Sequence, residues 1–180
     1  MPNNIILLPH KRIIFPLDVP SVDEATKYIH LLKDNVGVFK VGLELFVTEG
    51  PKVLKVIRDE TDAKIFLDLK FHDIPETVRR AQRAAIAHGV DFITVHCDEG
   101  TKLLKGAADS AKKNTMVLGI TVLTSLSEEN IINSGIKKEL QNPLKLALHR
   151  AETAKKSGCD GVVCSGKEVK AIKEKFGNDF

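Results

Sequence analysis

The sequence predicts an α/β fold in which parallel strands alternate with crossover helices. Short runs rich in Val, Ile and Phe alternate with longer amphipathic segments along the 180 residues, which is the pattern of consecutive βαβ units. The starts of the first five runs recur about every 25 residues, close to the ~30 residues of one such unit. No linker or low-complexity stretch interrupts this rhythm, so we expect a single domain over residues 1–180.

The expected strands share a high content of β-branched and aromatic residues and are bounded by polar or turn-forming residues. They are Arg12–Asp18, Val36–Val41, Lys64–Leu69, Asp91–Val95, Thr115–Val122 and Asp160–Cys164.

The expected helices between these strands carry the usual signals of helix ends. The run Ser21–Glu24 has the form of a capping box, and an apolar stripe accompanies it at Val22, Ala25, Ile29 and Leu32. Three prolines stand where a first helical turn would begin, a position that does not need the missing N–H: Pro51, Pro75 and Pro143. Gly89 and Gly158 follow the second and third of these helices, as C′ residues do.

Polar residues at the ends of the expected strands favour a barrel over an open doubly wound sheet. They lie at or just past the C-terminal end of each strand: Asp18, Lys40, Asp68 with Lys70, His96, Thr124 and Ser165. In a barrel those ends meet at one mouth, whereas in an open sheet they spread along a ridge. The first strand is followed by Asp18–Ser21 and not by a glycine-rich loop, which argues against a dinucleotide-binding fold. We therefore predict a TIM (β/α)8 barrel with about six of its eight β/α units in this chain.

Composition and charge exclude several classes of protein. The 27 Lys+Arg against 24 Asp+Glu leave a net charge of +3 without a dense basic cluster, so we expect no nucleic acid partner. The apolar run Ile5–Leu8 is too short for a signal-peptide core or a membrane span, so we expect a cytoplasmic protein without membrane contact. Cys97, Cys159 and Cys164 show no C-x-x-C spacing, so we expect buried thiols and neither a disulfide framework nor a zinc knuckle.

The segment from Asp68 to Asp73 carries the strongest chemical signal. Asp68 and Lys70 are two residues apart on an expected strand, so they should face the same side, the barrel interior. Asp73 follows in the loop before the helix that Pro75 begins, and Lys40 ends the preceding strand. Charged groups are rarely buried without partners, so two carboxylates around one ammonium predict a desolvated, mutually neutralising network. An ordinary ion-pair ladder at the strand ends is the alternative interpretation.

This segment resembles the signature of the orotidine 5′-phosphate decarboxylases, an apolar pair followed by D-x-K-x-x-D-I-P-x-T. The stretch Phe66–Thr77 matches that pattern at every fixed position. Phe15–Asp18 resembles the first-strand aspartate of the family, Phe39–Phe46 its second-strand lysine and Val122–Ser127 its fifth-strand pyrimidine loop. The loop Cys97–Gly100 departs from the small, glycine-containing loop that the family often has after its fourth strand.

The resemblance implies cofactor-free loss of CO2 from orotidine 5′-phosphate to give UMP, the last step of pyrimidine nucleotide synthesis. Lys70 would protonate C6 as the carboxylate departs, and Asp68 would lie against that carboxylate. Lys40 would orient Asp68 and the ribose, and Asp18 would bind the ribose hydroxyls.

The resemblance also implies further substrate contacts and a partner. Thr124 and Ser127 would bind the pyrimidine edge. Asp73, Ile74 and Thr77 would, as in the family, enter the site of the neighbouring subunit of a homodimer. Most soluble homo-oligomers are two-fold dimers, which agrees with this expectation.

Two other functions stay open from the sequence. A sugar-phosphate lyase of the same suprafamily would share D-x-K-x-x-D but bind Mg²⁺ and stabilise an enediolate; the continuation Ile74–Thr77 favours the nucleotide enzyme. The second is a non-catalytic remnant of a barrel enzyme, against which the intact carboxylates and lysine argue. His72 and His96 match no known spacing of metal ligands, and the ammonium of Lys70 would compete with a cation, so we expect neither metal nor cofactor.

The chain is short for a closed barrel. A (β/α)8 barrel typically needs ~250 residues, or ~200 at minimum, and the six expected units already extend to Phe180. The phosphate-binding arginine and glutamine of the family belong to the region of the seventh and eighth strands, for which the sequence offers no candidate. We therefore expect the chain to be truncated before those strands, or to be part of a longer polypeptide.

Overall fold

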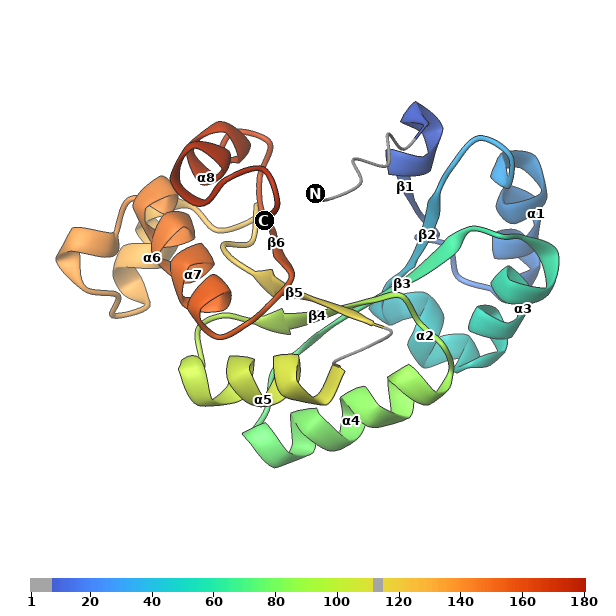
Figure 1. Cartoon of the computed structure of the whole chain (residues 1–180), viewed down its shortest axis with the longest axis horizontal. Coiled ribbons are helices and arrows are strands. Elements are labelled where there is room, and N and C mark those ends of the chain that lie inside the picture. The colour runs from blue at the N-terminus through green and yellow to red at the C-terminus, as the bar shows by residue number, and fades with distance from the viewer. Residues whose placement is uncertain (1–7, 112–114) are drawn as a thin grey trace, which may run out of the picture. The chain divides into compact units, whose positions relative to one another are not determined.

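The computed structural model describes residues 8–111 and 115–180, which alternate between strands and helices (Figure 1). Within these residues six strands are hydrogen-bonded side by side in the order β1-β2-β3-β4-β5-β6. The pairs β1/β2, β2/β3 and β5/β6 are parallel. An open doubly wound sheet reverses its strand order at a switch point, so the uninterrupted order is the topology of a (β/α) barrel. The strands are β1 Ile14–Pro16, β2 Val38–Val41, β3 Lys64–Phe71, β4 Phe92–His96, β5 Met116–Ile120 and β6 Gly161–Val163.

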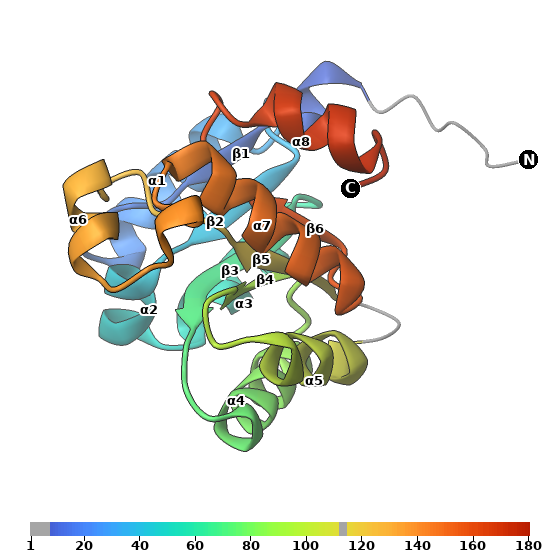
Figure 2. The same cartoon turned by 90° about the vertical axis from the view of Figure 1, so that its left-hand side faces the viewer.

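Helices fill the intervals between the strands. They are α1 Val22–Leu32, α2 Leu43–Glu49, α3 Lys52–Glu60, α4 Pro75–Ala87, α5 Thr101–Ala111, α6 Glu128–Asn133, α7 Pro143–Lys156 and, after β6, α8 Val169–Phe176. Two 3-10 turns cover Pro9–Arg12 and Lys138–Leu140. Figure 2 shows α7 beside β5 and β6, against which it packs.

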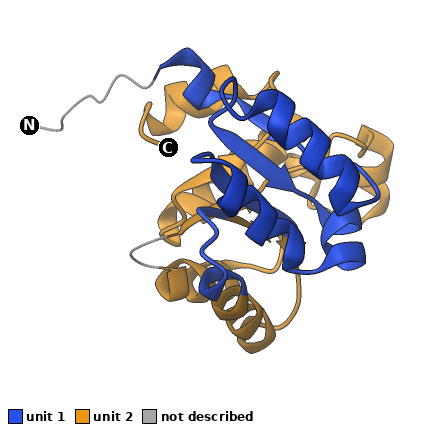
Figure 3. Ribbon diagram, turned by 90° about the vertical axis from the view of Figure 1, so that its right-hand side faces the viewer, with its two compact units in different colours: residues 1–69, 85–92 blue, residues 70–84, 93–180 orange. Residues whose placement is uncertain are grey.

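The chain forms two compact units (Figure 3). Unit 1 consists of residues 1–69 and 85–92, and unit 2 consists of residues 70–84 and 93–180. In unit 1, Ile29 of α1 and Phe39 of β2 are fully withdrawn from water. In unit 2, Ile93 of β4 and Leu104 of α5 are buried to the same degree. Each unit therefore has apolar side chains of helices and strands in its own core.

The first helix begins where its capping residue predicts. Ser21 precedes α1, and its side chain accepts a hydrogen bond from the Glu24 amide at 3.3 Å. The expected apolar stripe faces inward, since Val22, Ala25 and Ile29 are buried and Leu32 is half-buried.

The prolines and glycines also mark helix ends as expected. Pro75 and Pro143 are the first residues of α4 and α7, while Pro51 directly precedes α3. Gly89 and Gly158 follow α4 and α7 with φ of 72° and 88°. This is the left-handed conformation that a C′ residue adopts and that glycine reaches without strain.

The structure differs from the expected elements at several boundaries. β1 covers only Ile14–Pro16 of the expected Arg12–Asp18, and at the amino end Arg12 belongs to the 3-10 turn Pro9–Arg12. β3 continues two residues past Leu69. The sequence pattern does not predict α2 and α6, which are 7 and 6 residues long and too short to show a helical period.

The apolar run Ile5–Leu8 lies outside the described residues except for Leu8. No helix within residues 8–111 and 115–180 is long and apolar enough to cross a membrane.

Gly119, the last residue but one of β5, leaves room for two side chains of unit 2. A Cβ atom at this position would stand 2.6 Å from Sγ of Cys97 and 3.0 Å from Cβ of Ala154. Cys97 and Cys159 are buried free thiols, and burial raises the pKa of each to about 12. A reactive thiol needs a lowered pKa, so the raised pKa and the burial of Cys97 agree with the expected buried thiol.

We expect Gly119→Ala to destabilise the protein by about 1–3 kcal/mol, because an extra methyl group in a packed core forces its neighbours aside. Gly106→Ala in α5 is the matched control, since no atom lies within 4 Å of its Cβ position. Alanine favours a helix interior over glycine by about 0.5–1 kcal/mol. Urea denaturation measures both free energies of unfolding, and a Gly119→Ala protein as stable as the wild type would contradict tight packing at β5.

Candidate active site

Three charged side chains of unit 1 meet near the carboxyl ends of β1, β2 and β3. Lys40 on β2 donates a hydrogen bond from Nζ to Oδ1 of Asp18 at 2.9 Å and lies 4.0 Å from Oδ2 of Asp68 on β3. The side chains of Lys40 and Asp68 are 19% and 11% exposed, whereas that of Asp18 is 65% exposed. The ammonium therefore lies between one carboxylate in water and one largely withdrawn from it.

Gly42 leaves space for this ion pair. A Cβ atom at Gly42 would stand 3.2 Å from Nζ of Lys40 and 3.4 Å from Oδ1 of Asp18. The φ of Gly42 is −91°, which any residue can adopt. Glycine at this position thus keeps space open beside the two charged groups and is not needed for the backbone conformation.

Lys70 follows Asp68 by two residues on β3 and has an unusual backbone. Its φ is 49°, and no other non-glycine residue of the described ranges has a positive φ. Such a conformation costs about 1–3 kcal/mol and persists where the surroundings over-determine it, often at functional sites. The Lys70 amide donates a hydrogen bond to Oγ1 of Thr94 at 2.9 Å. Because the backbone departs here from the extended conformation, strand alternation alone does not determine where the Lys70 side chain points.

The loop after β3 contains His72 and Asp73. Nε2 of His72 lies 2.8 Å from Oε1 of Glu99. Oδ1 of Asp73 accepts a hydrogen bond at 2.6 Å from the amide of Ile74, the residue directly before α4. Ile74 is 67% exposed and Thr77 is also exposed.

Asp98, in the loop after β4, is the centre of a charged cluster of unit 2. Its carboxylate lies 3.5 Å from Nε2 of His72, 3.7 Å from Nδ1 of His96 and 3.6 Å from Nη2 of Arg150. Arg150 of α7 also donates a hydrogen bond from Nη1 to the Thr121 carbonyl at 2.6 Å, which ties α7 to the end of β5. In the described part of the chain, no group of three His, Cys, Asp or Glu side chains could hold a metal ion.

A cavity of about 160 Å³ lies beside the loop after β5, the expected pyrimidine loop. Leu123 and Leu126 of this loop and Asn130 of α6 contribute to its lining. Thr124 and Ser127 are exposed. Oγ of Ser127 accepts a hydrogen bond from the backbone amide of Asn130 at 3.2 Å, so this hydroxyl caps α6. The loop thus gives the cavity the apolar side chains of Leu123 and Leu126, and α6 adds the amide of Asn130.

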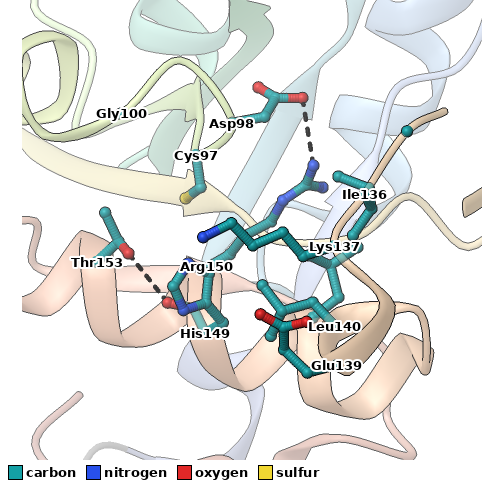
Figure 4. A pocket seen from close by; sticks show the side chains of 12 residues that line it. Cys97, Asp98, Gly100, Ile136, Lys137, Glu139, Leu140, His149, Arg150 and Thr153 are labelled. Atoms are coloured by element: carbon teal, nitrogen blue, oxygen red, sulfur yellow. Dashed lines mark hydrogen bonds and ion pairs between the residues drawn. The ribbon is translucent and has the colours of Figure 1, made fainter.

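A larger cavity, of about 500 Å³, lies between the loop after β4, residues 135–140 and α7 (Figure 4). The Asp98–Arg150 ion pair, drawn as a dashed line, forms part of its wall. Lys137 and His149 add further basic groups to the lining. Because Asp98 and Arg150 also line the smaller cavity, this ion pair is common to both.

Two residues of these clusters, Thr94 and Arg150, are not predicted from the sequence. A threonine inside an apolar strand and an arginine on an amphipathic helix are both ordinary features, so neither gives a signal in one sequence. The pattern Ser127-x-x-Asn130 forms a capping box, and such a box in the sequence indicates the start of a helix, here α6.

Comparison with known proteins determines the family of the chain. The family model described as Orotidine 5'-phosphate decarboxylase / HUMPS family matches residues 11–180. The chain belongs to this family. It is 49% identical over 174 residues to the orotidine 5'-phosphate decarboxylase of Desulfosudis oleivorans, an alignment that covers 96% of this chain and 70% of that protein.

Solved structures confirm the predicted barrel fold. The chain is similar to the crystal structure of orotidine 5'-phosphate decarboxylase from Lactobacillus acidophilus, with a TM-score of 0.84 and 36% identity over 93% of this chain and 77% of that one. It is also similar to an uncharacterized conserved protein from Geobacillus kaustophilus, with a TM-score of 0.85 and 32% identity over 93% and 80% of the two chains. The fold is therefore the (β/α) barrel of the decarboxylase family.

The pH dependence of stability tests the surroundings of His96. Burial lowers the pKa of His96 below its ordinary value of 6.5, and His72, Arg150 and Lys70 act in the same direction while Asp98 opposes them. The unfolded chain therefore takes up this proton at a higher pH than the folded chain. We expect the free energy of unfolding to fall as pH decreases from 6.5 towards the lower folded-state pKa.

The measurement compares wild type with His96→Gln by urea denaturation between about pH 5 and about pH 8.5. At the alkaline end the histidine is neutral in both states, so the difference there reports only lost contacts. The excess stability of the wild type should shrink on acidification. Parallel pH profiles of the two proteins would contradict a half-buried His96 whose pKa is lowered in the folded state.

Proposed function

We propose that the chain catalyses the decarboxylation of orotidine 5′-phosphate to UMP without a cofactor. The observation that carries the proposal is the placement of Asp68-x-Lys70 at the carboxyl end of β3, with Lys40 between Asp68 and Asp18. Relatives named orotidine 5'-phosphate decarboxylase, at up to 49% identity, support it. This reaction needs neither nucleic acid nor a membrane, and we place it in the cytoplasm.

In the proposed reaction the bond between C6 and the carboxylate breaks, CO2 leaves and the electron pair stays on C6. Nζ of Lys70 donates its proton to C6, and solvent later restores that proton to the amine. An ammonium held beside C6 before reaction stabilises the developing negative charge with little reorganisation. Asp68 lies against the departing carboxylate, where like-charge repulsion acts on the ground state, an effect of contested weight.

Other residues bind the substrate in this proposal. Lys40 orients Asp68 and the ribose, and the water-exposed carboxylate of Asp18 is available to the ribose hydroxyls. Thr124 and Ser127 bind the pyrimidine edge from the loop after β5. The apolar side chains that this loop gives to the smaller cavity suit a planar ring.

We expect Lys70→Ala to lower kcat by about 10²- to 10⁴-fold, the typical contribution of a positioned general acid. The loss of pyrimidine absorbance on mixing with orotidine 5′-phosphate measures turnover. Lys145→Ala, which removes an exposed lysine of α7, is the matched control and should turn over normally. Wild-type kcat in Lys70→Ala would exclude this lysine as the proton donor.

The second candidate is a Mg²⁺-dependent sugar-phosphate lyase, because the matching family model also covers the HUMPS proteins. The continuation Ile74-Pro75-x-Thr77 and the names of the curated relatives favour the decarboxylase. EDTA in the same assay separates the two. EDTA abolishes the activity of a lyase that requires Mg²⁺ and leaves the activity of a cofactor-free decarboxylase unchanged.

We further propose a homodimer in which Asp73, Ile74 and Thr77 reach the site of the neighbouring subunit. The exposure of Ile74 and Thr77 at the start of α4 supports this, because an isoleucine that is 67% exposed is available to a partner.

Subunit exchange tests the shared site. Lys70→Ala and Asp73→Ala proteins, each nearly inactive alone, are mixed and allowed to exchange. A mixed dimer carries one site with both lesions and one with neither, so part of the activity should return. Absence of recovery, with exchange shown by mass spectrometry of the native dimers, would refute the sharing of residues.

A further inference from the structure

We propose that Thr94 is a positioning residue that sets the direction of the Lys70 side chain through the Lys70 backbone. This inference rests on the proposed function, because it concerns the residue that donates the proton. It adds a residue that lies outside the D-x-K-x-x-D-I-P-x-T segment and on a different strand, β4.

The contact is specific and buried. Thr94 is the central residue of β4 and is fully withdrawn from water. Its Oγ1 accepts the hydrogen bond of the Lys70 amide at 2.9 Å, which is an ordinary length for such a bond. Both residues belong to unit 2.

The residue type at position 94 is informative because valine has the same shape without the hydroxyl. The neighbours of Thr94 along β4, Ile93 and Val95, are apolar and fully buried. A buried hydroxyl is costly unless it forms hydrogen bonds. The threonine therefore contributes an acceptor that an apolar residue of equal volume would not, and a described partner of that acceptor is Lys70.

The bond acts at the point where β3 leaves the extended conformation. With φ of 49°, Lys70 has a backbone that lysine rarely adopts. The hydrogen bond fixes the amide of Lys70 and so restricts rotation about its φ angle. Rotation about φ changes the direction of the Cα–Cβ bond, and with it the position of the side-chain ammonium. A misplacement of about 1 Å at a reacting group can cost about 100-fold in rate.

The experiment compares Thr94→Val, which removes the acceptor at constant shape, with Thr94→Ser, which keeps the hydroxyl. Thr115→Val is the matched control. Thr115 is also buried, at 7% exposure, but it directly precedes β5 and so lies at the amino end of that strand, away from the carboxyl ends. Should Thr94→Val fail to fold, Thr94→Ala removes the same acceptor.

Two readouts are taken on each protein: kcat and KM for orotidine 5′-phosphate, and the hydrogen-exchange rate of the Lys70 amide by NMR without substrate. We expect Thr94→Val to lower kcat by about 10- to 100-fold with KM within about threefold, since ground-state binding does not depend on the proton donor. The Lys70 amide should exchange faster in Thr94→Val. Thr94→Ser should restore kcat, and Thr115→Val should leave it unchanged.

Unchanged kcat in Thr94→Val, or an equal loss in Thr115→Val, overturns the positioning role. A wild-type chain that does not decarboxylate orotidine 5′-phosphate refutes the proposed function and not the contact. In that case amide exchange decides, and equal protection of Lys70 in wild type and Thr94→Val overturns the inference.

Discussion

The buried carboxylate of Asp68 is the constraint on which the residue types at the neighbouring strand ends depend. A carboxylate that is 11% exposed loses most of its hydration, and a buried charge is costly unless an opposite charge lies nearby. Lys40 supplies that cation, 4.0 Å away, and Asp18 holds the same ammonium by a hydrogen bond. A Cβ atom at position 42 would stand 3.2 Å from that ammonium, so glycine there keeps space open for the pair. One desolvated charge thus accounts for three further residues on the first two β/α units.

Parallel topology explains why each unit collects such a cluster. Successive parallel strands have their carboxyl ends at the same edge, so polar residues that follow each strand become neighbours. In unit 1 this joins Asp18, Lys40 and Asp68. In unit 2 the same rule places His96 at the end of β4 and Asp98 just after it, near the end of β5 that Arg150 contacts. The clusters follow from strand order, and their chemistry follows from which residues stand there.

The parts of the structure that were predictable are those that local sequence determines. Strand periodicity, the cap at Ser21 and the prolines at helix starts are local signals, and the order of the elements follows from them. The bond from Lys70 to Thr94 joins residues 24 positions apart, and no local pattern encodes it. The sequence does not predict the left-handed backbone at Lys70 either, because lysine is not a residue that is typical of such a turn.

Asp68 and Lys70 break two different local rules within three residues. Asp68 has an ordinary strand backbone but an unfavourable environment for a charge, whereas Lys70 has an unfavourable backbone, at φ of 49°. Glycine at position 70 would relieve that strain and would also remove the amine. Lys40 on β2 offsets the buried charge of Asp68, and Thr94 on β4 holds the unusual backbone of Lys70. Such unfavourable features occurring together are expected where function, and not stability, selects the residue. The strain at Lys70 is tolerated because β4, buried on both sides of Thr94, holds the acceptor in place.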